Sequence, residues 1–266
     1  MEEVIELVKL AGSKILEIYK TDFLVSYKGK NDPVTKADLL ANEIISSGIQ
    51  KLFPAHAILS EENLDDKSRL KNSDVWILDP IDGTKSFIAK DDDFAISLGY
   101  AKNQVLQFGI VHNPAKNELF VSSPYHSEIS EKKLETHNRK TATISRKLAI
   151  VSKTEFEEGI YANSFLETEF EIHSIGSIAY KLGLLSHGLC DLVISLKPKN
   201  EWDIAGGIAV LLSKGFEVLD CKHFQRHTFN NANTLSYGII AGKKELVSEI
   251  LEKHGDYLQK NLRSNW

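Results

Sequence analysis

The chain has 266 residues, a formal net charge of −5 and 42% hydrophobic residues, enough for a sizeable core in one large domain or two subdomains. An acidic balance without a basic stripe argues against nucleic acid as the main ligand. No apolar run reaches the roughly 18 residues of a membrane span, and acids at Glu2 and Glu3 replace the bases of a signal peptide. We therefore expect a cytoplasmic protein without a membrane partner.

Hydrophobic spacing predicts mixed structure in the first half of the chain. Apolar residues at helical intervals predict amphipathic helices over residues 4–18 and 40–52. Short apolar runs at 58–60 and 75–78 predict neighbouring buried strands. Alternating residues at 94–100, followed by a run at 105–111, predict an antiparallel meander.

From about residue 147 the pattern changes to alternating strands and helices. The expected strands lie at 148–151, around Ile172 and at 192–196, and the expected helices at 177–185, 204–212 and 245–258. The whole chain is thus predicted to be α/β, with an α+β N-terminal subdomain (1–146) and an α/β C-terminal subdomain (147–266). We expect them to form one compact catalytic unit, with most metal ligands in the first subdomain and the site between the two.

The most informative motif is Asp-Pro-Ile-Asp-Gly-Thr at residues 79–84, directly after a predicted buried strand. Asp79 and Asp82 would emerge together where that strand ends, and Mg²⁺ prefers such oxygen ligands. Gly83 allows close approach of a ligand, and a short helix beginning at Thr84 would present N–H groups to an anion. The alternative is a plain turn, because Asp-Pro and Asp-Gly are common turn dipeptides.

Further acids follow or begin other predicted elements. Glu61 follows the strand at 58–60, Asp203 precedes a helical run of small residues, and Asp38 lies at the start of the second helix. Each of them, taken alone, could be a helix cap or a solvated charge. Together with Asp79 and Asp82 they supply enough oxygen ligands for metal-assisted phosphoryl chemistry.

Four segments together resemble the inositol monophosphatase superfamily of Mg²⁺-dependent phosphatases. They carry Pro-Val-Thr-Lys-Ala-Asp, Ser-Glu-Glu, Trp-Ile-Leu-Asp-Pro-Ile-Asp-Gly-Thr and Trp-Asp-Ile-Ala-Gly-Gly, at residues 33–38, 60–62, 76–84 and 202–207. The resemblance implies a layered αβαβα sandwich and assembly as a homodimer. It also implies a small phosphate ester as substrate and two or three Mg²⁺ ions per site.

The resemblance further implies a role for each matching residue. Glu61, Asp79 and the main-chain carbonyl of Ile81 would hold one metal ion, and Asp79, Asp82 and Asp203 a second. Asp38 and Thr84 would activate the attacking water, and Glu62 would assist near a third, weaker ion. The amides of Gly83 and Thr84 would hold the phosphate. Glu61, Ile81, Asp82 and Asp203 would border the substrate as well as the metal.

The substrate is less directly indicated. Inositol monophosphatases usually carry a hydroxyl-binding glutamate seven residues before the Trp-Asp aspartate, where this chain has Leu196, followed by Lys197 and Lys199. Cations near the site suit a substrate with additional negative charge. Ser177 with Lys181 is similar to an element of bacterial 3′(2′),5′-bisphosphate nucleotidases, as is the segment 149–154. The lysines could instead be surface charges.

These observations favour removal of the 3′-phosphate of adenosine 3′,5′-bisphosphate, ahead of inositol 1-phosphate and then fructose 1,6-bisphosphate. Haloacid-dehalogenase phosphatases also carry Asp-Gly-Thr, but their nucleophilic aspartate would fall on Pro80, which excludes that pattern. A regulatory binding protein with the same fold is the other functional class, without a basic groove to favour it.

Two remaining features of the sequence bear on the structure and carry no catalytic or binding role. Residues 122–140 replace a stretch that usually contributes to a hairpin in the family, so we expect an atypical loop, with His126 on its surface. Cys190 and Cys221 lack metal-ligand spacing, and we expect no disulfide framework.

Overall fold

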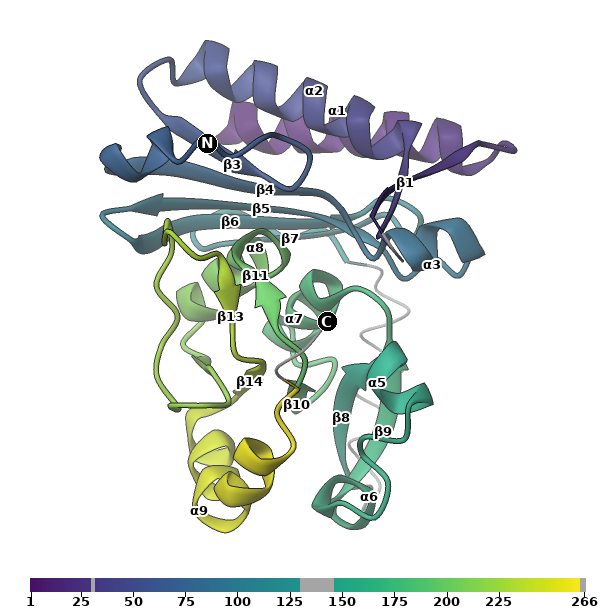
Figure 1. Ribbon diagram of the computed structural model, residues 1–266, viewed down its shortest axis with the longest axis vertical. Coiled ribbons are helices and arrows are strands. Elements are labelled where there is room, and N and C mark those ends of the chain that lie inside the picture. The colour runs from purple at the N-terminus through teal and green to yellow at the C-terminus, as the bar shows by residue number, and fades with distance from the viewer. Residues whose placement is uncertain (30–31, 130–145, 264–266) are drawn as a thin grey trace.

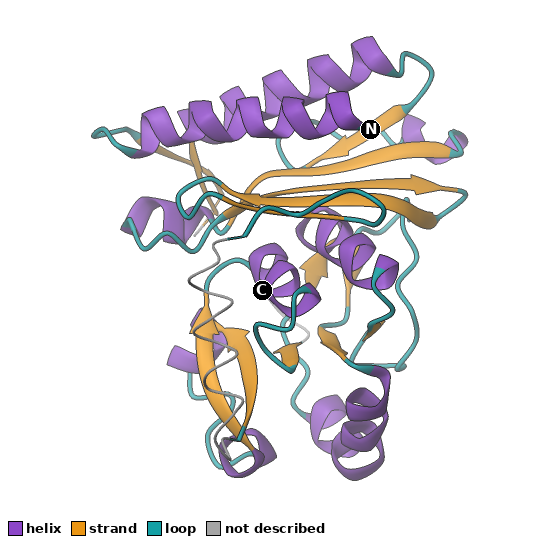
Figure 2. Ribbon diagram, turned by 180° about the vertical axis from the view of Figure 1, so that it is seen from behind, coloured by secondary structure: helices purple, strands orange, loops and turns teal. Residues whose placement is uncertain are grey.

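The computed structural model describes residues 1–29, 32–129 and 146–263, and its main elements stack as helix, sheet, helix, sheet, helix (Figure 1). Figure 2 shows the same layers from the opposite side. The helices of the three helical layers are α1 (Glu2–Tyr19) with α2 (Lys36–Leu52), α7 (Ile178–Ser186) with α8 (Glu201–Ser213), and α6 (Phe165–Glu169) with α9 (Lys244–Lys260). The predicted αβαβα sandwich is confirmed.

The first sheet lies between the α1–α2 layer and the α7–α8 layer. Its strands, in spatial order, are β3 (Ala57–Ser60), β4 (Asp74–Asp82), β5 (Ala95–Lys102), β6 (Val105–Asn113) and β7 (Glu118–Val121). Strands β3 and β4 are parallel, and the remaining neighbours are antiparallel, which confirms the predicted meander. Parallel pairing brings the carboxyl ends of β3 and β4 to one edge, where acids follow both apolar runs.

The second sheet lies between the α7–α8 layer and the α6–α9 layer. Its strands, in spatial order, are β12 (Glu217–Leu219), β14 (Ile239–Gly242), β10 (Leu192–Ser195), β8 (Lys147–Ser152) and β9 (Phe170–Ile175). Strands β10, β8 and β9 are parallel, and β14 pairs antiparallel with both β10 and β12. Parallel strands with helices on both faces agree with the strand–helix alternation predicted for this half.

Shorter elements complete the described residues. They are β1 (Val25–Gly29) paired with β2 (Asp32–Thr35), β11 (Lys199–Asn200) paired with β13 (Leu235–Ser236), the helices α3 (Thr84–Ala89) and α5 (Lys153–Glu157), and the 3-10 helix η1 (Ser68–Lys71). Apart from α3, the sequence patterns did not predict them, because each is too short for a hydrophobic period to show.

Among the residues that the structure describes, three hydrophobic cores fill the spaces between the layers, and strand alternation distributes residues among them. In β4, Trp76 and Leu78 pack under α1 and α2, whereas Val75 and Ile77 face α7 and α8. In β8, Ile150 belongs to this middle core, and its neighbours pack towards the α6–α9 layer. Successive side chains of a strand point to opposite faces, so a sheet covered on both faces is apolar throughout.

Strand β4 is longer than its apolar run indicated. The sequence predicted that Asp79 and Asp82 follow the strand, but β4 continues to Asp82. Asp79 lies opposite Ser97 and Asp82 opposite Ala95, so one extra residue of β4 is accommodated as a bulge. Residues three apart in a regular strand face opposite sides, whereas the bulge places both carboxylates on the same side of the sheet.

Close packing against glycines brings α8 onto the inner face of the first sheet. A Cβ atom at Gly109 in β6 would lie 2.4 Å from the carbonyl oxygen of Gly206, and one at Gly99 in β5 would lie 2.7 Å from Cβ of Ala205. The helix axis can therefore approach the strands closely, and its first turn lies near the edge formed by β3 and β4.

The remaining predictions about structure have mixed outcomes. His126 is exposed, as expected, and Cys190 and Cys221 are buried free thiols. Of the expected loop at 122–140, residues 130–140 lie outside the described part, and the rest returns to pair Glu128 with Leu119. Among the described residues, no helix combines the length and apolarity needed to cross a bilayer. The subdomain boundary at 146/147 stays a prediction.

Candidate metal centre and active site

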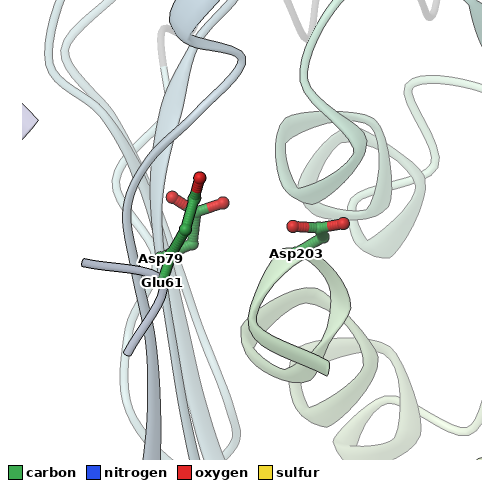
Figure 3. A group of neighbouring side chains, drawn as sticks. All are labelled: Glu61, Asp79 and Asp203. Carbon is green, nitrogen blue, oxygen red and sulfur yellow. The ribbon is translucent and has the colours of Figure 1, made fainter. Parts of the chain in front are cut away.

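Three carboxylates from distant parts of the chain converge at the edge of the first sheet. Glu61, Asp79 and Asp203 each offer one oxygen atom, and these atoms all lie within 4.8 Å of one another. Figure 3 shows Glu61 and Asp79 on the sheet side, with Asp203 opposite them at the start of α8. Asp79 is buried, and the other two are partly exposed. This is the arrangement that a shared cation requires.

Local backbone geometry explains the convergence. Ser60 in β3 lies opposite Leu78 in β4, and the N–H of Glu61 donates to the carbonyl of Leu78 at 3.2 Å, so Glu61 and Asp79 follow as neighbours. Asp203 is the third residue of α8, where its carboxylate accepts a hydrogen bond from the N–H of Asn200 at 2.8 Å. This capping box fixes the side chain of Asp203 at the helix N-terminus.

The electrostatics of the cluster favour a bound cation. Burial raises the pKa of Asp79 well above its usual range, and repulsion from Glu61, Asp82 and Asp203 raises it further. Burial, followed by repulsion from Asp82 and Glu61, raises the pKa of Asp203 to about 8. A divalent cation would relieve this repulsion, and an all-oxygen donor set fits a hard cation such as Mg²⁺.

Asp82 is connected to the middle helical layer as well as to the acidic cluster. Its carboxylate accepts hydrogen bonds from Oγ of Ser177 at 2.5 Å and from the N–H of Ala179 at 2.6 Å, at the start of α7. Burial raises the pKa of Asp82, and these two hydrogen bonds oppose the rise. Ser177, expected at the substrate, therefore contacts one of the predicted metal ligands.

Asp38 and Thr84 form a second polar pair beside the cluster. The hydroxyl of Thr84 lies 3.3 Å from Oδ1 of Asp38 and 3.1 Å from the carbonyl oxygen of Ile81, and it can donate to either. The other carboxylate oxygen of Asp38 accepts from the N–H and the hydroxyl of Thr35 at 2.7 and 2.6 Å. Burial raises the pKa of Asp38, and the neighbouring charge of Glu62 adds to the rise.

Gly83 connects these groups in a conformation that suits glycine. Its φ of 92° lies in the left-handed region, and a Cβ atom there would lie 2.9 Å from the carbonyl oxygen of Asp93. The chain therefore turns sharply from β4 into α3. This turn places Thr84 within reach of Asp38 and Ile81.

The three lysines expected near the substrate have different environments. Lys181 is buried, and its Nζ donates to the carbonyls of Ile175 and Gly176 at 2.9 and 3.3 Å, so it is not a surface charge. Lys197 is paired with Glu158 at 2.6 Å. The ammonium groups of Lys181 and Lys199 both favour the ionised form of Asp82, and that of Lys199 also favours the ionised form of Asp203.

Sequence reasoning missed Glu155 in α5, the most completely hydrogen-bonded acid near Lys199. It is fully buried and accepts hydrogen bonds from Tyr161, Ser195 and the backbone of Leu196 and Lys197. In the sequence it stands among exposed acids, and its position three residues after the helix-capping Ser152 is the one local signal that marks it. Its burial comes from tertiary packing.

Comparisons with known proteins agree with this geometry. Residues 1–258 match the model of the inositol monophosphatase family. A 3′(2′),5′-bisphosphate nucleotidase CysQ of Haemophilus influenzae is 28% identical, over 88% of this chain and 89% of that protein. A fructose-1,6-bisphosphatase/inositol-1-monophosphatase of Thermotoga maritima is also 28% identical, over 89% and 90%.

A solved structure extends the similarity to three dimensions. The crystal structure of CysQ from Bacteroides thetaiotaomicron, described as a bacterial member of the inositol monophosphatase family, has a TM-score of 0.72 and 27% identity, covering 91% of this chain and 96% of that one. A family match over nearly the whole chain, with the fold and acidic cluster described above, leaves one conclusion. The chain is a phosphatase and belongs to the inositol monophosphatase family.

Proposed function

We propose that this phosphatase is a Mg²⁺-dependent phosphoric monoester hydrolase that removes the 3′-phosphate of adenosine 3′,5′-bisphosphate, with water as the nucleophile. The observation that carries the proposal is the convergence of Glu61, Asp79 and Asp203, together with a Lys199 charge that favours the ionised form of Asp203. Carboxylates hold cations that neutralise one phosphate, and a nearby ammonium suits a second.

The metal ligands would be Glu61, Asp79, Asp82, Asp203 and the carbonyl of Ile81, holding Mg²⁺. The bound ions would supply an acidified water and neutralise charge on the leaving oxygen. The chain itself fixes the ligand positions through the bulge of β4 and the capping box of α8. Preorganised charge of this kind is what a phosphoryl transition state requires from a protein.

Asp38 and Thr84 would remove the proton of the attacking water. The Thr84 hydroxyl, between Asp38 and the Ile81 carbonyl, can accept from water while donating to the carboxylate. The raised pKa of Asp38 makes it a stronger base at neutral pH than an exposed aspartate. Thr35 holds the carboxylate in place from the other side, and Glu62 would assist from nearby.

The environment of the substrate supports a bisphosphate over a polyol. Leu196, at the position where a hydroxyl-binding glutamate is expected, is buried and aliphatic, so its side chain accepts no hydrogen bond. Lys199 supplies a cation whose charge favours the ionised form of Asp203. The relatives alone do not distinguish between these substrates, because a protein named as a nucleotidase and one named as a sugar and inositol phosphatase are both 28% identical to this chain. Inositol 1-phosphate is therefore the second candidate.

A phosphate-release assay tests the proposal. Adenosine 3′,5′-bisphosphate, inositol 1-phosphate and fructose 1,6-bisphosphate would be compared at matched concentrations with Mg²⁺ and with excess chelator. We expect the highest kcat/KM for the adenosine ester and no release with chelator. A preference for inositol 1-phosphate of more than about tenfold, roughly 1.4 kcal/mol in transition-state binding, would contradict the substrate assignment. Release that is insensitive to chelator would contradict the metal mechanism.

We also propose that the active form is a homodimer, as the family resemblance implies. Size-exclusion chromatography with light scattering measures this directly, since a monomer of this chain has a mass of 29.8 kDa. A species near twice that mass is expected, and a monomer with full activity would contradict the proposal.

A further inference from the structure

Glu155 is a buried carboxylate that no step of the proposed reaction uses. It lies in the short helix α5, and none of its side chain reaches solvent. A buried carboxylate is costly unless its oxygens are hydrogen-bonded, and those of Glu155 accept from several donors at once. The donors are the hydroxyls of Tyr161 and Ser195 and the N–H groups of Leu196 and Lys197, the last three at 2.5, 2.8 and 3.1 Å.

Three of these donors belong to one segment of the chain, which begins at the end of β10 and leads to the acidic cluster. Ser195 ends β10, Lys199 begins β11, and α8 with Asp203 follows directly. Glu155 thus anchors the beginning of a segment whose far end carries a metal ligand. The hydroxyl of Ser236 fixes the middle of the segment by donating to the carbonyl of Lys199 at 3.1 Å.

Glu155 also interacts with the Lys199 side chain directly. Oε1 of Glu155 lies 4.0 Å from Nζ of Lys199, whose side chain is 14% exposed. Burial alone would raise the pKa of Glu155, but Lys199, Ser195 and Tyr161 hold it below its ordinary value, so the carboxylate is ionised at neutral pH. Lys199 therefore interacts electrostatically with an ionised Glu155 and also with Asp82 and Asp203, whose ionised forms it favours.

We propose that Glu155 is a positioning residue that holds Lys199 beside the metal centre, so that the Lys199 ammonium receives the second anionic group of the substrate. This inference rests on the proposed function. Of the other two lysines, Lys181 is buried and donates to main-chain carbonyls while its charge favours the ionised form of Asp82, and Lys197 is paired with Glu158. The preference for a bisphosphate over a monophosphate then depends on Lys199, and through Lys199 on Glu155.

The experiment compares two substrates that differ only in the second phosphate, adenosine 3′,5′-bisphosphate and adenosine 3′-monophosphate. The variants are Glu155→Gln, Lys199→Gln and the double variant. Glu157→Gln is the matched control, because Glu157 is an exposed acid of the same helix. Loss of one charged contact predicts that Lys199→Gln raises KM for the bisphosphate about tenfold, with KM for the monophosphate changed less than about twofold.

Glu155→Gln is expected to reproduce most of that rise in KM, because the amide keeps the shape but removes the charge, and its NH2 group mispairs with one of the two main-chain N–H donors. In the double variant the effects should not multiply, since Glu155 acts through Lys199. Ser195→Ala removes a single donor to Glu155 and should shift the same preference in the same direction, by less. Ser195→Ala therefore tests the positioning role of Glu155 even if Glu155→Gln fails to fold.

Each other outcome would contradict the inference about Glu155, the substrate assignment or the proposed function. Equal loss of kcat on both esters, with multiplicative effects in the double variant, would show that Glu155 only maintains the fold and would overturn the inference. An unchanged preference in Lys199→Gln would overturn it as well. Turnover of monophosphates without any preference for the bisphosphate in the native chain would overturn the substrate assignment and the inference together. Absence of phosphate release from every ester would overturn the proposed function itself.

Discussion

The carboxylate of Asp82 accepts a hydrogen bond from the hydroxyl of Ser177 at 2.5 Å, and this contact links the first sheet to the N-terminus of α7. The same carboxylate accepts from the N–H of Ala179 at 2.6 Å. An anion at a helix N-terminus is stabilised by the unpaired N–H groups and by the helix dipole. Asp82 therefore joins two layers of the sandwich in addition to its proposed metal-binding role.

Replacement of Asp82 should separate these two contributions. Asp82→Asn keeps an oxygen that can accept from Ser177 and Ala179, so the far-ultraviolet circular dichroism should be unchanged, while phosphate release falls by more than about a hundredfold. Ser177→Ala should instead lower the free energy of unfolding by about 1 kcal/mol, since Ser177 also caps α7 by accepting from the N–H of Tyr180. Undiminished phosphate release by Asp82→Asn would contradict the proposed site.

The stability of the metal-free protein should depend on pH through the acidic cluster. The pKa of Asp203 is about 8 in the folded chain, against 3.8 as its ordinary value, so the folded state binds a proton that the unfolded state has lost between these two pH values. Stability from this group is complete below pH 3.8 and is lost as pH rises towards 8.

Mg²⁺ should reverse that loss, so the rise in the thermal-unfolding midpoint on adding Mg²⁺ should grow between pH 5 and pH 8. Asp203→Asn removes the charge, and without Mg²⁺ its midpoint at pH 8 should exceed that of the native chain. The same variant should show little stabilisation by Mg²⁺. A Mg²⁺ effect that is equal in native chain and variant would exclude Asp203 as a ligand.

Asp38 should matter for catalysis more than for metal binding. Asp38→Asn removes the proton acceptor, and kcat should fall by about 10²–10⁴-fold while the Mg²⁺-induced rise in the unfolding midpoint persists. The control is Thr35→Ala, which weakens the same helix cap but leaves the carboxylate. It should cost about 1 kcal/mol of stability with a much smaller loss of kcat. Equal kcat losses in the two variants would assign Asp38 a capping role alone.

Two helix glycines should respond to alanine in opposite directions. A Cβ atom at Gly206 in α8 would lie 2.5 Å from the carbonyl oxygen of Ile110 and 2.8 Å from the N–H nitrogen of Leu98, both main-chain atoms of the first sheet. Gly206→Ala should therefore lower the free energy of unfolding by about 1–3 kcal/mol and displace the first turn of α8, reducing phosphate release.

The matched variant is Gly255→Ala in α9, where the new Cβ atom would make ordinary contacts of 3.4 and 3.5 Å with the ring of Phe224. It should raise the free energy of unfolding by about 0.5–1 kcal/mol, because alanine favours the helix, and leave phosphate release unchanged. Chemical denaturation of both variants measures the difference. Equal effects at the two positions would contradict the close approach of α8 to the sheet.

The sequence by itself determined the family and the mixed layered fold, and it predicted the acids of the candidate site. Long amphipathic helices such as α1 and apolar strands such as β6 can be recognised from the spacing of their hydrophobic residues. The motif at residues 79–84 and the Trp-Asp segment carry residue types that suit one chemistry. Periodicity did not reveal the short elements, including α5 and β11, because they are shorter than the window in which a period can be detected.

Tertiary structure alone decided how the acids meet and which partners each of the three lysines has. The alternation of a regular strand would place Asp79 and Asp82 on opposite faces, and the bulge of β4 overrides it because the register with β5 shifts by one residue. Three lysines that are alike in sequence differ in the folded chain because burial and partners depend on distant segments. Glu155 likewise differs from the exposed acids beside it only through contacts that long-range packing creates.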